Sequence, residues 1–224
     1  MRVKIHHEGT NIILILLAIL LAINIPVWLY ANAAFLPVAI VSALLWLCVV
    51  NFFRSPRRRY TGERDNIVLS SADGKVVALE ETFEDEYLHQ RVIQVSVFMT
   101  VFNVHANWFP VDGEVVMSKH HSGRFMAAYL PKSSTENERS TIVIKAKNGQ
   151  EILVRQIAGA IARRIVTYAE PGNEANIEDH MGFIKFGSRI DIYLPLDAEI
   201  LVKLGDKTTG GITPVARLKS QQNA

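Results

Sequence analysis

The sequence predicts an all-β domain of sandwich or barrel type, preceded by an N-terminal membrane hairpin of two helices. Residues 11–30 and 33–50 are apolar runs without a charged side chain. A helix needs about 20 such residues to cross the hydrocarbon of a bilayer. From Asn66 onward, by contrast, apolar and polar residues alternate with a period of two, which is typical of half-buried strands.

The residues around the two apolar runs predict a turn and an orientation. Pro26 and Pro37 flank a short break at 30–32, where the chain is expected to turn between helices. Basic residues precede the hairpin at positions 2 and 4 and follow it at 54 and 57–59. Positive charge at both ends predicts that the hairpin lies in the inner cell membrane, with the downstream domain on the cytoplasmic face. A cleaved signal peptide is disfavoured by the second apolar run. A re-entrant hairpin, which would give the same orientation, is the remaining alternative.

The composition divides the chain into four segments. We expect a two-helix membrane anchor at 1–53, a basic linker at 54–65, the β-rich domain at 66–219 and a tail at 220–224. The linker arginines are expected to act as a topology signal, to lie against anionic headgroups, or both.

Within the β-rich domain, short runs rich in Val and Ile are separated by Gly, Asp, Asn and Pro. Helical periodicity is weak apart from one turn at 158–164. The predicted strands are 67–71, 75–80, 91–98, 113–117, 124–129, 141–146, 151–157, 189–194, 199–204 and 214–218.

Several function classes lack their signals in this chain. The formal net charge of +2 and the absence of a basic stripe with aromatics argue against nucleic-acid binding. A single cysteine, Cys48, permits no disulfide within one chain. There is no dinucleotide fingerprint, no phosphate-cradling loop and no zincin motif. The adjacent histidines at 120–121 have no third ligand in view, so no metal is expected.

Three residues carry the candidate chemistry. The pair Gly187-Ser188 stands directly before a predicted strand, where a hydroxyl can attack the preceding carbonyl if a base removes its proton. Asp73 lies in a turn between strands, and His105 lies beside aromatic residues. Asp, His and Ser can together form a hydroxyl-activating triad. Each of the three, taken singly, is more often a structural residue.

With these residues in place, the chain resembles the phosphatidylserine decarboxylase proenzymes, in the short pyruvoyl-dependent form of bacteria and archaea. The resemblance extends from about residue 54 to residue 219, and the short form has Phe-Gly-Ser where the longer form has Leu-Gly-Ser. The motifs that carry it are Ala72-Asp73-Gly74, Phe102-Asn103-Val104-His105, Glu136-Asn137-Glu138-Arg139, Gln156-Ile157-Ala158-Gly159 and Phe186-Gly187-Ser188.

The resemblance implies a precursor that cleaves itself between Gly187 and Ser188. His105, oriented by Asp73, would deprotonate Ser188, whose oxygen attacks the Gly187 carbonyl. Elimination and hydrolysis would then leave a covalent pyruvoyl group at position 188. The products would be a large fragment, 1–187, and a small fragment, 188–224, paired as a heterodimer whose further assembly stays open.

The resemblance further implies the reaction. The pyruvoyl ketone would form a Schiff base with phosphatidylserine, held in the bilayer, and would withdraw electrons as carbon dioxide leaves, giving phosphatidylethanolamine. Glu138 and Arg139 are expected either to support the site in a structural network beneath it or to lie in a solvated turn. One departure concerns the second histidine of the longer enzymes, since Phe102 occupies its position. Three candidates are therefore left for the acid that protonates the carbanion: His105 acting a second time, a water molecule or a tyrosine.

Three questions stay open at this point. The aromatic segment 108–110 either dips into the membrane interface or packs in the core. A membrane-anchored peptidase of the signal-peptidase kind is an alternative, but Ser188 is not followed by the Met-x-Pro which that family requires. A non-catalytic, membrane-tethered β domain is the other alternative, and it predicts no chain cleavage.

Overall fold

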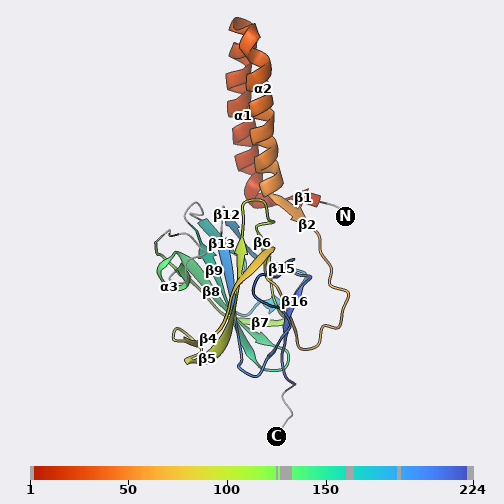
Figure 1. The fold of residues 1–224 in the computed structure, drawn as a ribbon, viewed down its shortest axis with the longest axis vertical. Helices are drawn as coiled ribbons and strands as arrows, with labels where there is room; N and C mark the ends of the chain where they lie inside the picture. Colours follow the sequence, from red (N-terminus) through yellow and green to blue (C-terminus); the bar gives the residue numbers. More distant parts are fainter. Residues whose placement is uncertain (1–2, 125, 127–132, 160–163, 186–187, 221–224) are drawn as a thin grey trace. The chain divides into compact units, whose positions relative to one another are not determined.

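The computed structural model of the chain describes residues 3–124, 126, 133–159, 164–185 and 188–220. It divides into two compact units, Met1–Arg57 and Arg58–Ala224. The first unit contains two long helices and a small pair of strands, and the second contains nearly all of the β structure (Figure 1).

In the first unit, helices α1 (His7–Tyr30) and α2 (Asn32–Phe52) lie side by side and run antiparallel (Figure 1). Strand β1 (Val3–Ile5) precedes them, and β2 (Arg54–Pro56) follows them and pairs with β1. The two ends of the hairpin are thereby joined by backbone hydrogen bonds.

Both helices are long and apolar enough to cross a membrane. At 1.5 Å per residue they extend about 36 and 32 Å. They confirm the two predicted apolar helices, although Pro26 and Pro37 lie inside them rather than at their ends. Asn24 Nδ2 donates hydrogen bonds to the Leu20 carbonyl and to Ser42 Oγ, each at 2.8 Å, so a polar contact ties α1 to α2.

In the second unit the described strands form three sheets. The largest has eight strands in the order β11-β7-β8-β9-β13-β5-β4-β15, and two three-stranded sheets have the orders β10-β12-β6 and β14-β16-β3. The strands are β3 Ile67–Leu69, β4 Gly74–Glu84, β5 Gln90–Met99, β6 Ala106–Trp108, β7 Gly113–His121, β8 Arg139–Ala146, β9 Glu151–Ala158, β10 Arg164–Thr167, β11 Glu174–Ala175, β12 His180–Lys185, β13 Ser188–Leu194, β14 Glu199–Ile200, β15 Lys207–Thr208 and β16 Pro214–Arg217; a short helix, α3, spans Ser133–Glu136.

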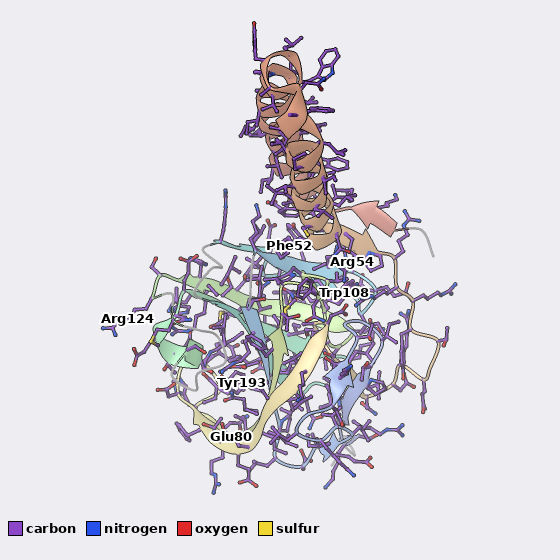
Figure 2. The ribbon with its side chains drawn as sticks, turned by 45° about the horizontal axis from the view of Figure 1, so that its top comes forward. Phe52, Arg54, Glu80, Trp108, Arg124 and Tyr193 are labelled. Atoms are coloured by element: carbon purple, nitrogen blue, oxygen red, sulfur yellow. The ribbon has the colours of Figure 1, made fainter. Side chains whose placement is uncertain are left out.

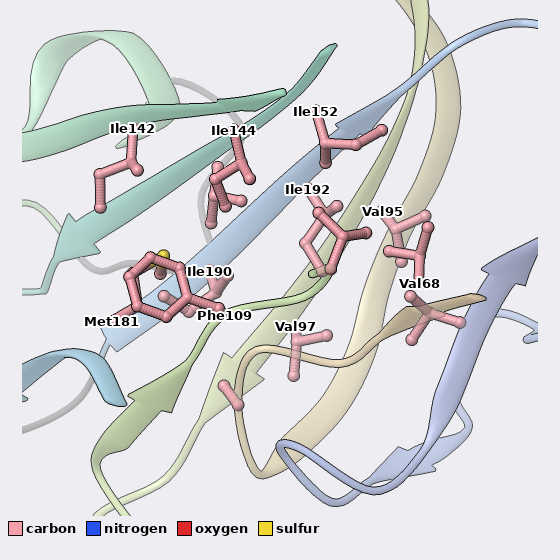
Figure 3. Packing of buried hydrophobic residues seen from close by; sticks show 14 of the residues in the cluster. Val68, Val95, Val97, Phe109, Ile142, Ile144, Ile152, Met181, Ile190 and Ile192 are labelled. Carbon is pink, nitrogen blue, oxygen red and sulfur yellow. The ribbon is translucent and has the colours of Figure 1, made fainter. Parts of the chain in front are cut away.

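One face of the eight-stranded sheet packs against both small sheets. Ile142, Ile152 and Ile192 of the large sheet contribute to this core, and Met181 of β12 and Val68 of β3 contribute from the small sheets (Figure 3). Side chains alternate along a strand, so the even-numbered residues of β13 point into this core. Burial of these apolar faces is the main favourable contribution to the free energy of folding.

The all-β prediction for the second unit is confirmed. Predicted strands at 91–98, 151–157 and 189–194 correspond to β5, β9 and β13. The strands β6, β10 and β12 were not predicted, and together they form one of the small sheets. The helical turn predicted at 158–164 and the strand predicted at 124–129 lie mostly outside the described residues.

Candidate active site

Ser188 is the first residue of β13, the strand at the centre of the large sheet. β13 pairs antiparallel with β5 on one side and with β9 on the other, and Ser188 lies opposite Met99 and Ala158. Its side chain is fully buried on the core face, and Oγ donates a hydrogen bond to Met99 Sδ at 3.2 Å. A hydroxyl held in an apolar interior is shielded from competing water.

The connection that precedes Ser188 joins two different sheets. β12 ends at Lys185 in a three-stranded sheet, and β13 begins at Ser188 in the eight-stranded sheet. Phe186 and Gly187 themselves lie outside the described residues. A break in the chain between Gly187 and Ser188 would leave both strands whole.

His105 is fully buried just before β6, and its backbone carbonyl accepts a hydrogen bond from Ile184 N of β12 at 3.2 Å. Its ring Nδ1 lies 3.0 Å from the carbonyl oxygen of Asn103. A carbonyl only accepts, so Nδ1 carries the hydrogen and Nε2 is the basic nitrogen of the neutral ring. The fold therefore gives His105 the tautomer that a general base at Nε2 requires.

Two buried amide side chains lie near Ser188. Gln156 of β9 lies on the same face as Ser188, two residues from its partner Ala158, and its Nε2 donates to Asn107 Oδ1 at 2.8 Å. Asn107 Nδ2 in turn lies 3.8 Å from Met99 Sδ, the sulfur that Ser188 contacts. Gln156 Oε1 is buried and has no hydrogen-bond partner among the residues that the structure describes. An unpaired buried acceptor is costly, and such groups occur at functional sites.

The carboxylate of Asp73, predicted to orient His105, forms hydrogen bonds with Arg58 and Gly210. Arg58 donates to both of its oxygens, at 2.5 and 2.8 Å, and the backbone N–H of Gly210 donates to Oδ1 at 2.9 Å. Arg58 Nη1 also donates to the Gly210 carbonyl at 2.7 Å. Asp73 thus anchors the turn that follows β15, and its orientation of His105 stays a prediction.

Trp108 forms the surface beneath this ion pair. The Arg58 guanidinium carbon lies 4.2 Å from the centroid of the Trp108 ring, within cation–π range. A Cβ at Gly210 would come 2.7 Å from the same ring, so glycine permits this close approach. Trp108, which is labelled in Figure 2, is buried, and Phe109 is also buried. Of the two readings of segment 108–110, the structure supports the core.

We predict that replacing Arg58 with glutamine frees the turn around Gly210. Hydrogen bonds to charged groups stabilise the folded turn, so their loss should raise the rate of amide exchange at residues 208–211 roughly ten-fold or more. Hydrogen exchange read by mass spectrometry on the full chain measures this. Arg59→Gln is the matched control, because the Arg59 side chain is 84% exposed. Unchanged exchange in Arg58→Gln would contradict the anchoring role.

With this geometry established, comparison with known proteins identifies the chain. A family model described as phosphatidylserine decarboxylase matches residues 45–216. The chain belongs to the phosphatidylserine decarboxylase family.

Curated relatives match the chain over nearly its whole length. It is 54% identical over 217 residues to the phosphatidylserine decarboxylase proenzyme of Parabacteroides distasonis. The aligned region covers 96% of this chain and 99% of that protein. Proteins of the same name from Bacteroides thetaiotaomicron and Porphyromonas gingivalis are 52% and 51% identical, covering 97% and 96% of this chain and 96% and 99% of theirs.

The predicted supporting residues of this phosphatidylserine decarboxylase family member lie at the strand end beside Ser188. The Glu138 carbonyl accepts from Ala158 N at 2.9 Å, and Asn137 Nδ2 donates to the Ala158 carbonyl at 2.7 Å. Arg139 Nη1 donates to the Thr135 carbonyl at 2.7 Å, which ties β8 to α3. Glu138 therefore acts on the strand through its backbone.

A second polar cluster lies on the opposite face of β13. Arg155 contacts Glu84 at 2.5 Å and donates to Tyr193 Oη at 3.0 Å. Burial, followed by the charge of Asp191, raises the pKa of Tyr193. Burial alone would raise the pKa of Glu86, but Arg155 and neighbouring cations outweigh it and the pKa is lowered. The cluster faces away from Ser188, so we assign it to stability rather than to chemistry.

Sequence reasoning missed Arg58, Met99 and Asn107 as neighbours of the site. Arg58 stood in a basic run, where it was expected to signal topology or meet headgroups, whereas its side chain is 6% exposed. Met99 and Asn107 occupy strand positions that carry no motif of their own. A clue was available for Asn107 alone, since it lies two residues from His105.

Proposed function

We propose that this chain is a self-processing phosphatidylserine decarboxylase that acts through a pyruvoyl group made from Ser188. The observation that carries the proposal is the position of Ser188 in a member of this family. It is the buried first residue of the central strand, directly after the link between two sheets. The family and the names of the relatives support the substrate class and the precursor form.

Self-cleavage follows from residues of the chain. His105 Nε2 takes the proton of Ser188 Oγ, and the oxygen attacks the carbonyl carbon of Gly187. The Gly187–Ser188 amide becomes an ester as its nitrogen takes the proton from His105 and becomes the α-amine of Ser188. Loss of the Ser188 Cα proton then eliminates the Gly187 carboxylate across the Cα–Cβ bond and leaves dehydroalanine. Hydrolysis of its imine tautomer releases ammonia and leaves the pyruvoyl group. Asn103 supports this role of His105 because its carbonyl orients the ring.

The residues around Ser188 fit a pyruvoyl group. The group supplies a ketone that withdraws electrons from the bond to a departing carboxylate. Gln156 Oε1 is a buried acceptor that no described residue contacts by a hydrogen bond, and it suits an N–H of the substrate's serine amine. Met99 and Ala158 exclude water on both sides of position 188.

The two fragments are expected to stay together after cleavage. β13 would belong to the small fragment, whereas both of its neighbours, β5 and β9, would belong to the large fragment. β15 and β16 add pairing with β4 and β3. This backbone pairing and the shared core hold the heterodimer without a disulfide.

The two apolar helices support a membrane location. Their length and composition suit a bilayer, and the basic residues at both ends of the hairpin favour a domain on the cytoplasmic face of the cell membrane. Because a diacyl lipid stays in the bilayer, an anchored domain remains close to its substrate.

The test combines intact mass with an assay for carbon dioxide. Purified full-length protein should yield two fragments, 1–187 and 188–224, the smaller with a blocked N-terminus, and should release carbon dioxide from phosphatidylserine. A signal-peptidase-type enzyme or a non-catalytic domain would give neither the blocked fragment nor the gas. A single uncut chain that still releases carbon dioxide would overturn the pyruvoyl route.

A further inference from the structure

Two apolar side chains are exposed on the turn that follows β5. Thr100 N and Oγ1 both donate to Asn103 Oδ1 at 2.8 Å, and Asn103 N donates back to the Thr100 carbonyl at 2.9 Å. The turn is thus well ordered by hydrogen bonds. It carries Val101, 41% exposed, and Phe102, 76% exposed. Among the described residues of the unit Arg58–Ala224, no large apolar side chain is more exposed than Phe102.

This turn is flanked by residues of the candidate active site. Met99, whose sulfur accepts the hydrogen bond from Ser188, lies two residues before Val101. His105 lies three residues after Phe102. Whatever the turn contacts is therefore brought to the edge of the site.

A pair of basic residues lies at the same end of the adjoining three-stranded sheet. Arg164 of β10 and Lys185 of β12 are direct partners in the antiparallel register. Their neighbours Ile165 and Ile184 point into the core, so the two basic side chains lie on the other face. Ile184 N of β12 donates a hydrogen bond to the His105 carbonyl, and this bond brings the end of β12 beside the turn.

Two basic side chains on one face of a strand pair create a local positive potential that attracts anions. Here the basic pair lies beside exposed apolar side chains, and the surface of an anionic bilayer presents the same combination: phosphate groups next to hydrocarbon. A soluble anion such as free phosphate would account for the basic pair alone.

We propose that Val101, Phe102, Arg164 and Lys185 form a lipid-binding rim that receives anionic phospholipid at the active site. The apolar pair enters the boundary between headgroups and acyl chains, and the basic pair binds the phosphodiester. The proposal rests on the proposed function for the identity of the substrate. It also moves the membrane contact away from the buried Trp108.

The first test compares two forms of the substrate. Phe102→Ser should lower kcat/KM on phosphatidylserine in phosphatidylcholine vesicles roughly ten-fold more than on monomeric short-chain phosphatidylserine. Leu204→Ser is the matched control, because Leu204 is 67% exposed on another turn, and it should behave like the parent on both. Equal losses on both substrate forms in Phe102→Ser would overturn the lipid contact.

The second test addresses the basic pair. Arg164→Gln should raise KM on the same vesicles at low salt and flatten its salt dependence, since a charge facing phosphate is removed. Arg91→Gln, which changes an exposed arginine paired with Glu81, is the control. Intact mass verifies that both variants are cleaved as the parent is. An unchanged salt dependence in Arg164→Gln would contradict phosphodiester binding.

A third measurement is independent of activity. In a Cys48→Ser, Ser188→Ala background, Val101→Cys labelled with a polarity-sensitive fluorophore should shift to the blue in phosphatidylglycerol vesicles relative to detergent. Leu204→Cys should not shift. If Val101→Cys behaves like Leu204→Cys, the proposal of a lipid-binding rim is wrong, even if the parent protein with Ser188 cleaves itself normally. If the shift occurs in a chain whose parent is never cleaved, the rim stands and the pyruvoyl proposal fails.

Discussion

Replacing Ser188 with alanine will leave a single uncut chain and abolish decarboxylation. Alanine has no hydroxyl to attack the Gly187 carbonyl, so neither the ester nor the pyruvoyl group forms. The fold should persist, because Ser188 contributes one hydrogen bond to a sulfur and the pairing of β13 with β5 and β9 is made by the backbone. Denaturing electrophoresis with intact mass, together with release of carbon dioxide, measures both effects.

The matched control for this change is Ser96→Ala. Ser96 is also fully buried and pairs with β13 opposite Asp191, but that register puts it on the face away from Ser188. It should be cleaved and should remain active. A Ser188→Ala protein that still yields the 188–224 fragment would show that the hydroxyl of Ser188 is not the nucleophile.

Replacing His105 with glutamine will slow self-cleavage by about 10²- to 10⁴-fold, the usual contribution of a general base. Glutamine keeps a polar side chain of similar length but cannot take the proton of Ser188 Oγ. The half-time for appearance of the 188–224 fragment after synthesis measures the effect. The residual cleavage should still occur between Gly187 and Ser188, because the position of the bond is set by the fold.

His120→Gln serves as the control for that change. His120 is half-exposed on β7 and lies 3.7 Å from Glu138. Its loss should leave the half-time within about two-fold of the parent, as expected of a surface substitution. Cleavage of His105→Gln at the parental rate would instead assign the base to another group, and Asp73→Asn would then be the next variant to time.

Much of the fold is local and was therefore predictable. The alternation of Val95 and Val97 with polar residues marks β5, and Ile190 and Ile192 mark β13 in the same way. β12 was missed because its residues 181–184 are buried on both faces, so no alternation remains to be read. β6 was missed because three residues are too few for a period.

The apolar hairpin, the alternating strands, and the candidate nucleophile and base could be predicted from the chain alone, because each depends on neighbouring residues. The pairing of Arg58 with Asp73 and Gly210 could not, because these residues lie 15 and 152 positions away from it and meet it only in the folded domain. The tertiary structure also decided which aromatic residue is buried and which is exposed, Trp108 or Phe102. The physical reason is that burial and ion pairing depend on contacts between distant segments, which periodicity does not encode.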